Sequence, residues 1–306
     1  MTVHDPWTID SVLAAFDEHL RRARGACPEV RRTYTRFARA FLESVSEEHL
    51  QELAGMSAQA VIRFVSATTA QYRPSTVKLV ATSLRSFFRF LRVGGWRQDR
   101  LEDAVPTVPH RWHASLPRYL REREFACLMA SLDTASPRAL RDKAILLCLA
   151  RLGLRASEVT RLQLEDVDWR AGTVHVHTRK TGRGAVLPLP RDLGRALVAY
   201  LRHGRPATPA RHVFVLHRMR VGEPANRQVV GDAVRRALRH AGISAPIQGA
   251  NLLRHSLASS LLRHGATLKE IADLFGHRSL NTTTIYAKVD LAALRDVALP
   301  WPEGTP

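Results

Sequence analysis

The sequence has few cysteines and no long hydrophobic run. Cys27, Cys127 and Cys148 are odd in number and lack the spacing of zinc ligands, so we expect neither a disulfide framework nor a metal site. No apolar stretch approaches the roughly 18 residues that a membrane span needs. The N-terminal residues lack the basic-then-apolar pattern of a secretion signal. These absences predict a cytoplasmic protein with no membrane partner.

Acidic residues are scarce as well. The 306 residues include 28 Asp and Glu against 46 Lys and Arg, a formal net charge of +18, and the hydrophobic fraction of 45% is that of a folded protein. Only five of the basic residues are lysines, so nucleotide bias explains part of the arginine excess. Such bias does not explain why acids are so few. The charge therefore favours a polyanionic partner, and nucleic acid is the commonest one in a cytoplasm.

Residues 1–95 form the first predicted domain. From residue 8 onward, apolar residues recur at helical spacing, and Pro28 and the pair Gly94-Gly95 mark a helix start and a helix end. The pattern predicts four amphipathic helices, of which the third is a short one near 57–68. Four such helices can bury a core of their own, so we expect a small helical bundle.

Four basic residues of this bundle are candidate DNA-binding residues. Lys78, Arg85 and Arg89 lie off the apolar face of the fourth predicted helix, and Arg73 stands just before that helix begins. A charged helix face that is merely solvated shows the same pattern, so this interpretation depends on the overall charge of the chain.

The helical pattern lapses over residues 96–117. Three prolines with interspersed arginine and histidine predict an extended basic linker there, and hence a domain boundary. The larger second domain is predicted over residues 118–298. It begins with two helices, near 120–131 and 137–150.

Strand periodicity occurs at one place in the second domain. Val174 and Val176 alternate with histidines, a turn that contains Lys180 follows, and residues 183–189 return, which predicts a β-hairpin. The fold class is therefore mainly α with a small antiparallel β-sheet, in two domains. Further helices are predicted near 191–203, 227–241, 251–264, 267–275 and 291–299, before a tail at 300–306.

Two arginines stand at predicted helix starts, where the positive end of the helix dipole disfavours a cation unless an anion shares the site. Arg155 is followed one turn later by Glu158, which either supports its guanidinium or simply favours the helix start. Arg254 lies three residues after Asn251 and thus on the same helix face. Asn251 can equally be an N-cap. In a chain so rich in arginine, both arginines are also compatible with an ordinary surface position.

Three more residues have chemistry that their positions alone do not establish. Lys180 has a compact ammonium that can give up a proton, which arginine does not readily do. His277 follows the glycine that ends a predicted helix and can donate to a phosphate oxygen. Tyr286 offers a phenol that becomes an oxygen nucleophile when cations stabilise its anion. Solvated turn residues and a half-buried structural tyrosine are the ordinary alternatives.

Taken in order, these residues form one pattern: an arginine, a lysine 25 residues later in a hairpin, Asn-x-x-Arg, Gly-His-x-Ser, and a tyrosine nine residues after that histidine. The segments GLRASE, LLRHSLAS and LFGHRSLNTTTIYAKV carry it. With them the chain resembles the tyrosine recombinase family, also called the phage-integrase or lambda-integrase family, and within it bacterial integrases and chromosome-dimer-resolving recombinases. The resemblance implies a helical core-binding (SAM-like) domain that binds DNA, followed by a catalytic domain.

The resemblance also implies a reaction without metal, cofactor or ATP. Tyr286 would attack a scissile phosphodiester and give a 3′-phosphotyrosyl enzyme and a free 5′-hydroxyl. Arg155 and Arg254 would bind the non-bridging oxygens. Lys180 would protonate the departing oxygen, and His277 would hydrogen-bond the phosphate. The sequence agrees with this, because it has no Gly-Lys-Ser/Thr phosphate loop and no clustered carboxylates.

The sequence departs from the family's pattern at Asn251. Histidine is usual there and is thought to help accept the tyrosine proton. Asparagine cannot take that proton at neutral pH, although it can hydrogen-bond a phosphate or cap the helix. Our hypothesis is an active enzyme with a weaker or substituted base, and the alternative is an inactive relative.

The partners implied by the resemblance are double-stranded DNA with a specific recombination site and further copies of the chain, as a tetramer on two duplexes. Residues 291–299 resemble the C-terminal helix that packs onto a neighbouring subunit in the family, and the alternative is that they fold back on their own domain. Two other functions stay open. One is a DNA-binding regulator without catalysis, and the other is a type IB topoisomerase that relaxes supercoils with the same tyrosine chemistry.

Overall fold

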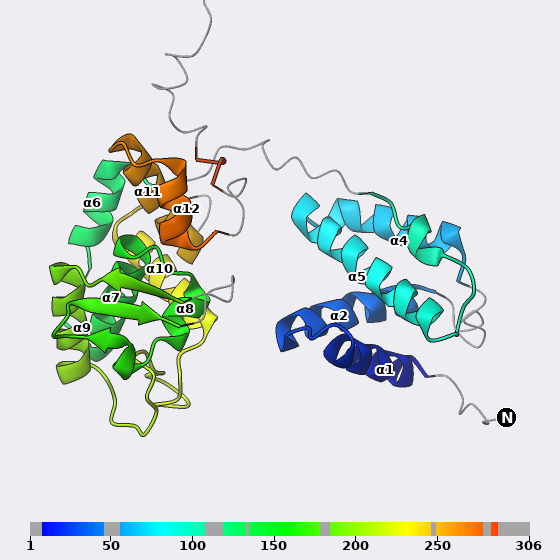
Figure 1. The fold of residues 1–306 in the computed structure, drawn as a ribbon, viewed down its shortest axis with the longest axis horizontal. Coiled ribbons are helices and arrows are strands. Elements are labelled where there is room, and N and C mark those ends of the chain that lie inside the picture. The colour runs from blue at the N-terminus through cyan, green and yellow to red at the C-terminus, as the bar shows by residue number, and fades with distance from the viewer. Residues whose placement is uncertain are drawn as a thin grey trace, which may run out of the picture. The chain divides into compact units, whose positions relative to one another are not determined.

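The computed structural model describes most of the chain, in two compact units that span residues 1–111 and 112–306 (Figure 1). The predicted fold class is confirmed: both units are mainly helical, and the second contains a small antiparallel sheet. The described residues are 8–45, 56–107, 119–132, 135–177, 184–245, 249–277 and 283–286.

The first unit contains the four predicted helices. Pro28 and Pro74 open the second and fourth of them, where a missing N–H costs nothing, and Gly94 caps the fourth. Phenylalanines fill the core: Phe16 packs edge-on against Phe87 with ring centroids 5.2 Å apart, and Phe41 packs in the same way against Phe88 at 5.3 Å. The helices are α1 (Ile9–Arg22), α2 (Pro28–Ser44), α4 (Ala58–Gln71) and α5 (Pro74–Val93).

The predicted linker over residues 96–117 is wrong in its first half. A short 3-10 helix, η2 (Leu101–Ala104), follows α5, and Leu101 and Val105 are buried in the core of the first unit. The Arg92 guanidinium donates to the buried Glu102 carboxylate at 2.8 Å and ties this segment to α5. The apolar side chains of residues 96–107 therefore dock on the helices, and the remaining linker positions lie outside the described residues.

The basic residues on α5 have different surroundings. Arg73, Lys78 and Arg89 are exposed. Arg85 instead donates to the carbonyl oxygens of Val105 and Pro106, at 2.9 and 3.0 Å, and so fastens the segment after η2 to the helix. Arg85 therefore has a structural role in addition to any contact with DNA.

The second unit is built around α7, whose residues Ala144 to Ala150 are buried. Helices α9, α10 and α11 pack against it. The predicted hairpin is confirmed as β2 and β3, with Val174 opposite Leu187. A two-residue strand, β1, pairs with β2 at the other edge and is too short to show as alternation in the sequence. The elements are α6 (Glu122–Ala130), α7 (Pro137–Arg151), α8 (Ala156–Arg161), η3 (Leu164–Asp166), β1 (Val167–Asp168), β2 (Thr173–Val176), β3 (Ala185–Pro188), α9 (Arg191–His203), α10 (Arg227–His240), α11 (Ala250–Arg263) and α12 (Leu268–Phe275).

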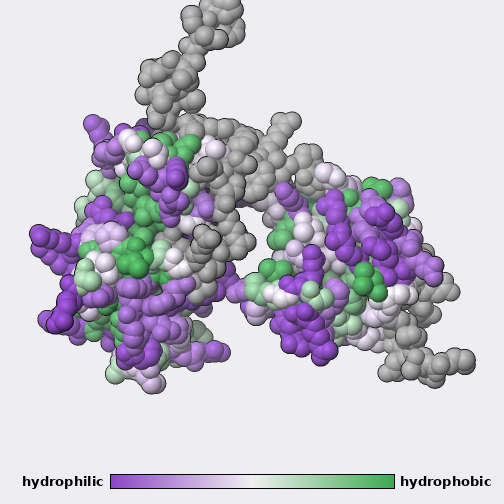
Figure 2. All heavy atoms as spheres, viewed as in Figure 1, coloured by the Kyte–Doolittle hydropathy of each residue, from purple (hydrophilic) through white to green (hydrophobic). Residues whose placement is uncertain are grey.

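Hydrophilic residues cover much of the visible face of each unit (Figure 2). Among the described residues, no helix is both long enough and apolar enough to cross a membrane. Two predicted features lie outside the described residues: the hairpin turn with Lys180 and the amphipathic segment at 291–299.

Candidate active site

The turn between α7 and α8 presents the first arginine. Gly153 in this turn has φ +59°, in the left-handed region, and a Cβ at this position would lie only 2.4 Å from Cε1 of Phe275. Only glycine lets the backbone approach α12 this closely. Arg155 follows as the N-cap of α8, so the turn sets its position.

Glu158 does both of the things that the sequence left open. One carboxylate oxygen accepts from the Arg155 backbone N–H at 2.9 Å and caps the helix. The other accepts from the Arg155 guanidinium at 2.8 Å. Because Glu158 is 5% exposed, this ion pair is shielded from water, and it holds the arginine side chain in a defined orientation.

Arg254 on α11 joins three elements. Its side chain is buried, and its guanidinium donates to the carbonyl oxygens of Gly153, before α8, and of Phe275, at the end of α12. The guanidinium carbon also lies 4.0 Å from the centre of the Phe275 ring. These contacts fix the second arginine beside the turn that presents the first.

His277 is placed by the end of α12. Gly276 adopts the left-handed conformation at φ 58°, which turns the chain so that the His277 N–H bonds the carbonyl of Ala272. The imidazole Nε2 lies 3.3 Å from an Arg254 nitrogen, and Nδ1 lies 2.7 Å from the Thr283 hydroxyl. Since a guanidinium only donates, Nε2 accepts from Arg254 and the Nδ1–H donates to Thr283.

Tyr286 lies in the short turn at residues 283–286 and is 2% exposed. Its ring packs edge-on against Phe275, and its hydroxyl shares a 2.8 Å hydrogen bond with Nδ1 of His255. Burial raises the pKa of the phenol to about 12, and the charges of Arg254 and Arg155 act in the opposite direction. Both guanidiniums thus act on this hydroxyl, and both favour its anion.

The structure brings together Arg155, Arg254, His277 and Tyr286 from four separate places in the sequence. Asn251 is exposed on the first turn of α11, and the N-cap there is Gly249, so the reading of Asn251 as a helix cap is wrong. Lys180 lies outside the described residues.

The sequence interpretation missed His255. The signal for it was a histidine directly after Arg254 in LLRHSLAS and four residues after Asn251, hence on the face of α11 where the family's histidine would project. Its contact with Tyr286 depends on where the chain returns 31 residues later, which no local pattern shows.

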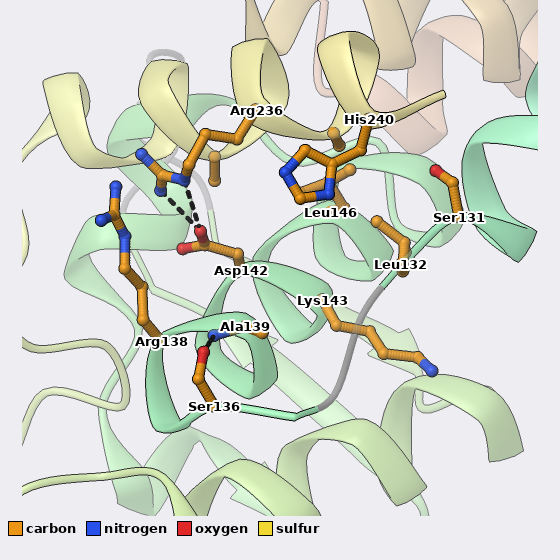
Figure 3. Close-up of a pocket in the computed structure, with 12 residues that line it drawn as sticks. Ser131, Leu132, Ser136, Arg138, Ala139, Asp142, Lys143, Leu146, Arg236 and His240 are labelled. Carbon is orange, nitrogen blue, oxygen red and sulfur yellow. Dashed lines mark hydrogen bonds and ion pairs between the residues drawn. The ribbon is translucent and has the colours of Figure 1, made fainter. Parts of the chain in front are cut away.

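A hollow of about 160 Å³ between α7 and α10 lies outside this cluster of residues (Figure 3). Its Asp142 carboxylate accepts from Arg236 on α10 and from Arg141 on its own helix. Burial lowers the pKa of Arg138, which lines the same hollow, with neighbouring arginines adding to the effect. These charges form an ion-pair network that ties the two helices together. Among the described residues, no group of three or more His, Cys, Asp or Glu is arranged to hold a metal ion.

The profile of the phage integrase family matches residues 118–292, and that of the phage integrase N-terminal SAM-like domain matches residues 13–94. The chain therefore belongs to the phage integrase family, the tyrosine recombinases. A Sinorhizobium fredii protein that carries the name of an integrase/recombinase, y4rA, is 40% identical over 299 residues, which cover 98% of this chain and 73% of that protein. The tyrosine recombinase XerC of Halalkalibacterium halodurans is 30% identical over 94% of this chain and 96% of its own.

Solved structures of recombinases share the fold. The site-specific recombinase XerH, in a post-cleavage complex with palindromic difH substrate, has a TM-score of 0.74 at 20% identity and covers 95% of this chain and 85% of that one. A lambda integrase dimer bound to a COC′ core site has a TM-score of 0.68 at 17% identity, over 98% of this chain and 99% of that one.

Proposed function

We propose that this protein is a site-specific DNA recombinase that breaks and rejoins strands through a 3′-phosphotyrosyl bond to Tyr286. The observation that carries the proposal is the placement of the phenol: it is held at the meeting point of α11 and α12, where two guanidiniums stabilise its anion. A structural tyrosine in a hydrophobic core has no need of two cations.

The arginines and the histidine would bind the scissile phosphate. Arg155 and Arg254 would donate to the non-bridging oxygens, where negative charge grows as the fifth bond to phosphorus forms. His277 would give up its contact with the Arg254 guanidinium and donate to the same phosphate from Nε2, which then carries the ring proton while Nδ1 accepts from the Thr283 hydroxyl. Both arginines are already oriented, by Glu158 and by two backbone carbonyls, so little reorganisation is required when DNA binds.

The leaving oxygen needs a proton that neither arginine can supply. Lys180, which falls between β2 and β3 in the sequence, is our candidate for this role. The energy of the phosphodiester is retained in the phosphotyrosyl bond, so a second 5′-hydroxyl reverses the step and the reaction needs no ATP.

The partner would be double-stranded DNA with a specific recombination site, bound by several copies of the chain. Arg73, Lys78 and Arg89 on the first unit are exposed and available to contact phosphates, in line with the net charge of +18. A tetramer on two duplexes, with residues 291–299 exchanged between subunits, would complete the assembly. A protein that acts on chromosomal DNA is expected in the cytoplasm.

A direct test uses DNA that the protein itself selects. Duplexes bound from a random pool are sequenced, and the selected site is rebuilt with a nick near the point of cleavage, so that a short fragment diffuses away and the covalent complex accumulates. We expect an SDS-resistant protein–DNA band with the wild type and none with Tyr286→Phe, which should bind the same DNA. Binding by both proteins without any covalent band would support a regulator instead, and relaxation of site-free supercoiled plasmid would support a topoisomerase.

A further inference from the structure

We propose that His255 is the base that accepts the Tyr286 phenol proton, the role left vacant by asparagine at position 251. The inference deepens the proposed function and rests on it. It makes His255 a catalytic residue, because its ring nitrogen touches the reacting hydroxyl.

The geometry of α11 explains how a histidine at position 255 can act as the base in place of one at position 251. Asn251 and His255 are four residues apart and lie one above the other on the same face. Asn251 is exposed on the first turn, whereas His255 is half-buried one turn further in. The His255 and Tyr286 rings are 5.5 Å apart between centroids, and Nδ1 lies 2.8 Å from the hydroxyl oxygen, a direct distance for proton transfer.

The other polar groups of the site are unsuited to the task. Arg155 and Arg254 only donate. His277 lies 3.3 Å from Arg254 and 2.7 Å from the Thr283 hydroxyl, and its part in the reaction is to bind the phosphate. The Glu158 carboxylate is committed to Arg155, through both its guanidinium and its backbone N–H. Among the described residues, His255 is the hydrogen-bond partner of the Tyr286 hydroxyl.

The step balances as a simple proton transfer. As the phenol oxygen forms its bond to phosphorus, the O–H bond breaks and the proton passes to Nδ1, which makes His255 an imidazolium. The 5′-oxygen leaves with a proton from the acid on the other side. In the rejoining step the 5′-hydroxyl attacks and gives its proton back to the acid on the leaving-group side, while the imidazolium returns its proton to the departing phenol oxygen.

The charges around His255 couple its basicity to the substrate. Burial and the neighbouring Arg254 lower the pKa of His255, which favours the neutral form of the ring. The charged and titratable groups around His255 come from three elements. Arg254 lies on the same helix, α11, and Arg155, whose charge acts on Tyr286, lies at the start of α8. His277, after the end of α12, bonds Arg254. A bound phosphate would offset the two guanidinium charges and so make His255 more basic when DNA is in place.

The free protein offers the first test. In protein labelled with ¹⁵N-histidine, we expect the His255 ring near pH 7 to carry its proton on Nε2, with Nδ1 bare and accepting from the phenol. Tyr286→Phe should shift that Nδ1 signal and leave the signal of the exposed His264 unchanged. A His255 ring protonated on Nδ1 would overturn the proposal, because that nitrogen could not then accept.

Cleavage kinetics offer the second test. His255→Asn keeps a polar atom near the hydroxyl but cannot take a proton, and should slow formation of the covalent band by about 10² to 10⁴ fold. Its rate should rise with pH across 6 to 9, where the wild type is nearly level. His264→Asn, a change of the same kind at the exposed C-cap of the same helix, should match the wild type.

A substrate with sulfur in place of the bridging 5′-oxygen separates the two proton transfers. Sulfur leaves without a proton, so this substrate should not rescue His255→Asn. Rescue would show that His255 protonates the leaving group. A wild-type rate in His255→Asn would show that His255 has no catalytic role. Either outcome overturns the proposal. A faster covalent reaction in that variant would also overturn it, by showing that the bond restrains Tyr286. No band with the wild type itself would instead contradict the proposed function.

Discussion

The two units of this chain bury different kinds of side chain. The first packs phenylalanines from three helices, and among its described residues Glu102 is the charged residue buried as a whole, with the Arg97 side chain 8% exposed. The described part of the second unit buries four charged residues, namely Arg141, Glu158, Asp166 and Arg254. Buried charge is costly unless it is paired, so its concentration in one unit needs a reason.

Burial of charge alone does not mark the site. Arg141 pairs with Asp142, and Asp166, just before β1, pairs with His177, just after β2; both pairs are structural. Glu158 and Arg254 differ because their network reaches a phenol that both site arginines influence. The first unit thus obtains stability from aromatic packing, while the second combines stability with a positively charged site for an anion.

The largest expected effect on covalent cleavage comes from changing Arg254, which connects α11 to the turn before α8. Arg254→Ala removes the guanidinium and leaves the carbonyls of Gly153 and Phe275 without a donor. We expect at least about 10²-fold slower covalent cleavage, by analogy with the loss of one transition-state donor. Arg254→Lys should recover little, because an ammonium cannot reproduce the planar fork. Cleavage by Arg254→Lys at the wild-type rate would show that charge alone is required.

A change in the aromatic core of the first unit tests whether the two units unfold independently. Phe88→Ala removes a fully buried ring and should cost about 3–5 kcal/mol of unfolding free energy. Amide hydrogen exchange should report the loss in α5 and leave protection in α11 unchanged. Equal loss of protection in α11 would show that the two units unfold together.

A matched pair of glycines measures the close approach of the turn to α12. Gly153 and Gly172 both have left-handed φ, +59° and +64°, but only a Cβ at 153 would meet another side chain. Gly172→Ala should cost about 1 kcal/mol from backbone strain alone. Gly153→Ala should cost a further 1–3 kcal/mol from overpacking against Phe275 and should slow cleavage. Urea unfolding measures both variants, and equal losses would show that the contact gives way easily.

The smallest effect concerns DNA contacts of the first unit. Arg89→Ala should lower the slope of log affinity against log salt by about one, the value for one lost phosphate contact. Arg85→Ala should change the slope less and reduce stability by about 1 kcal/mol, because its guanidinium bonds two carbonyls of the segment after η2. Equal changes in slope would place both residues on the DNA.

Local patterns in the sequence predicted most of the fold. Helix boundaries followed from Pro28 and from the pair Gly94-Gly95, and the hairpin followed from the alternation around Val174. The docking of residues 96–107 was missed because prolines suggested an extended linker. Leu101 and Val105, four residues apart, are buried in the core of the first unit, where η2 contacts α5 and α4, and no local pattern reveals this docking.

The site was predictable in its residue types and not in its contacts. Arg155, Arg254, His277 and Tyr286 followed from a motif, and the supporting role of Glu158 was one of two options. His255 was missed because the motif directs attention to position 251. Its contact with Tyr286 arises only when the turn at 283–286 comes back onto α11, a tertiary feature that no spacing in the sequence reveals.

The most direct test of the central claim is to identify the residue that carries the DNA. The covalent complex formed on the nicked selected site is isolated, digested with nuclease and protease, and its adduct is located by mass spectrometry. The account predicts a nucleotide joined through its 3′-phosphate to Tyr286, with no adduct in Tyr286→Phe. An adduct on another residue, or one joined through a 5′-phosphate, would contradict it.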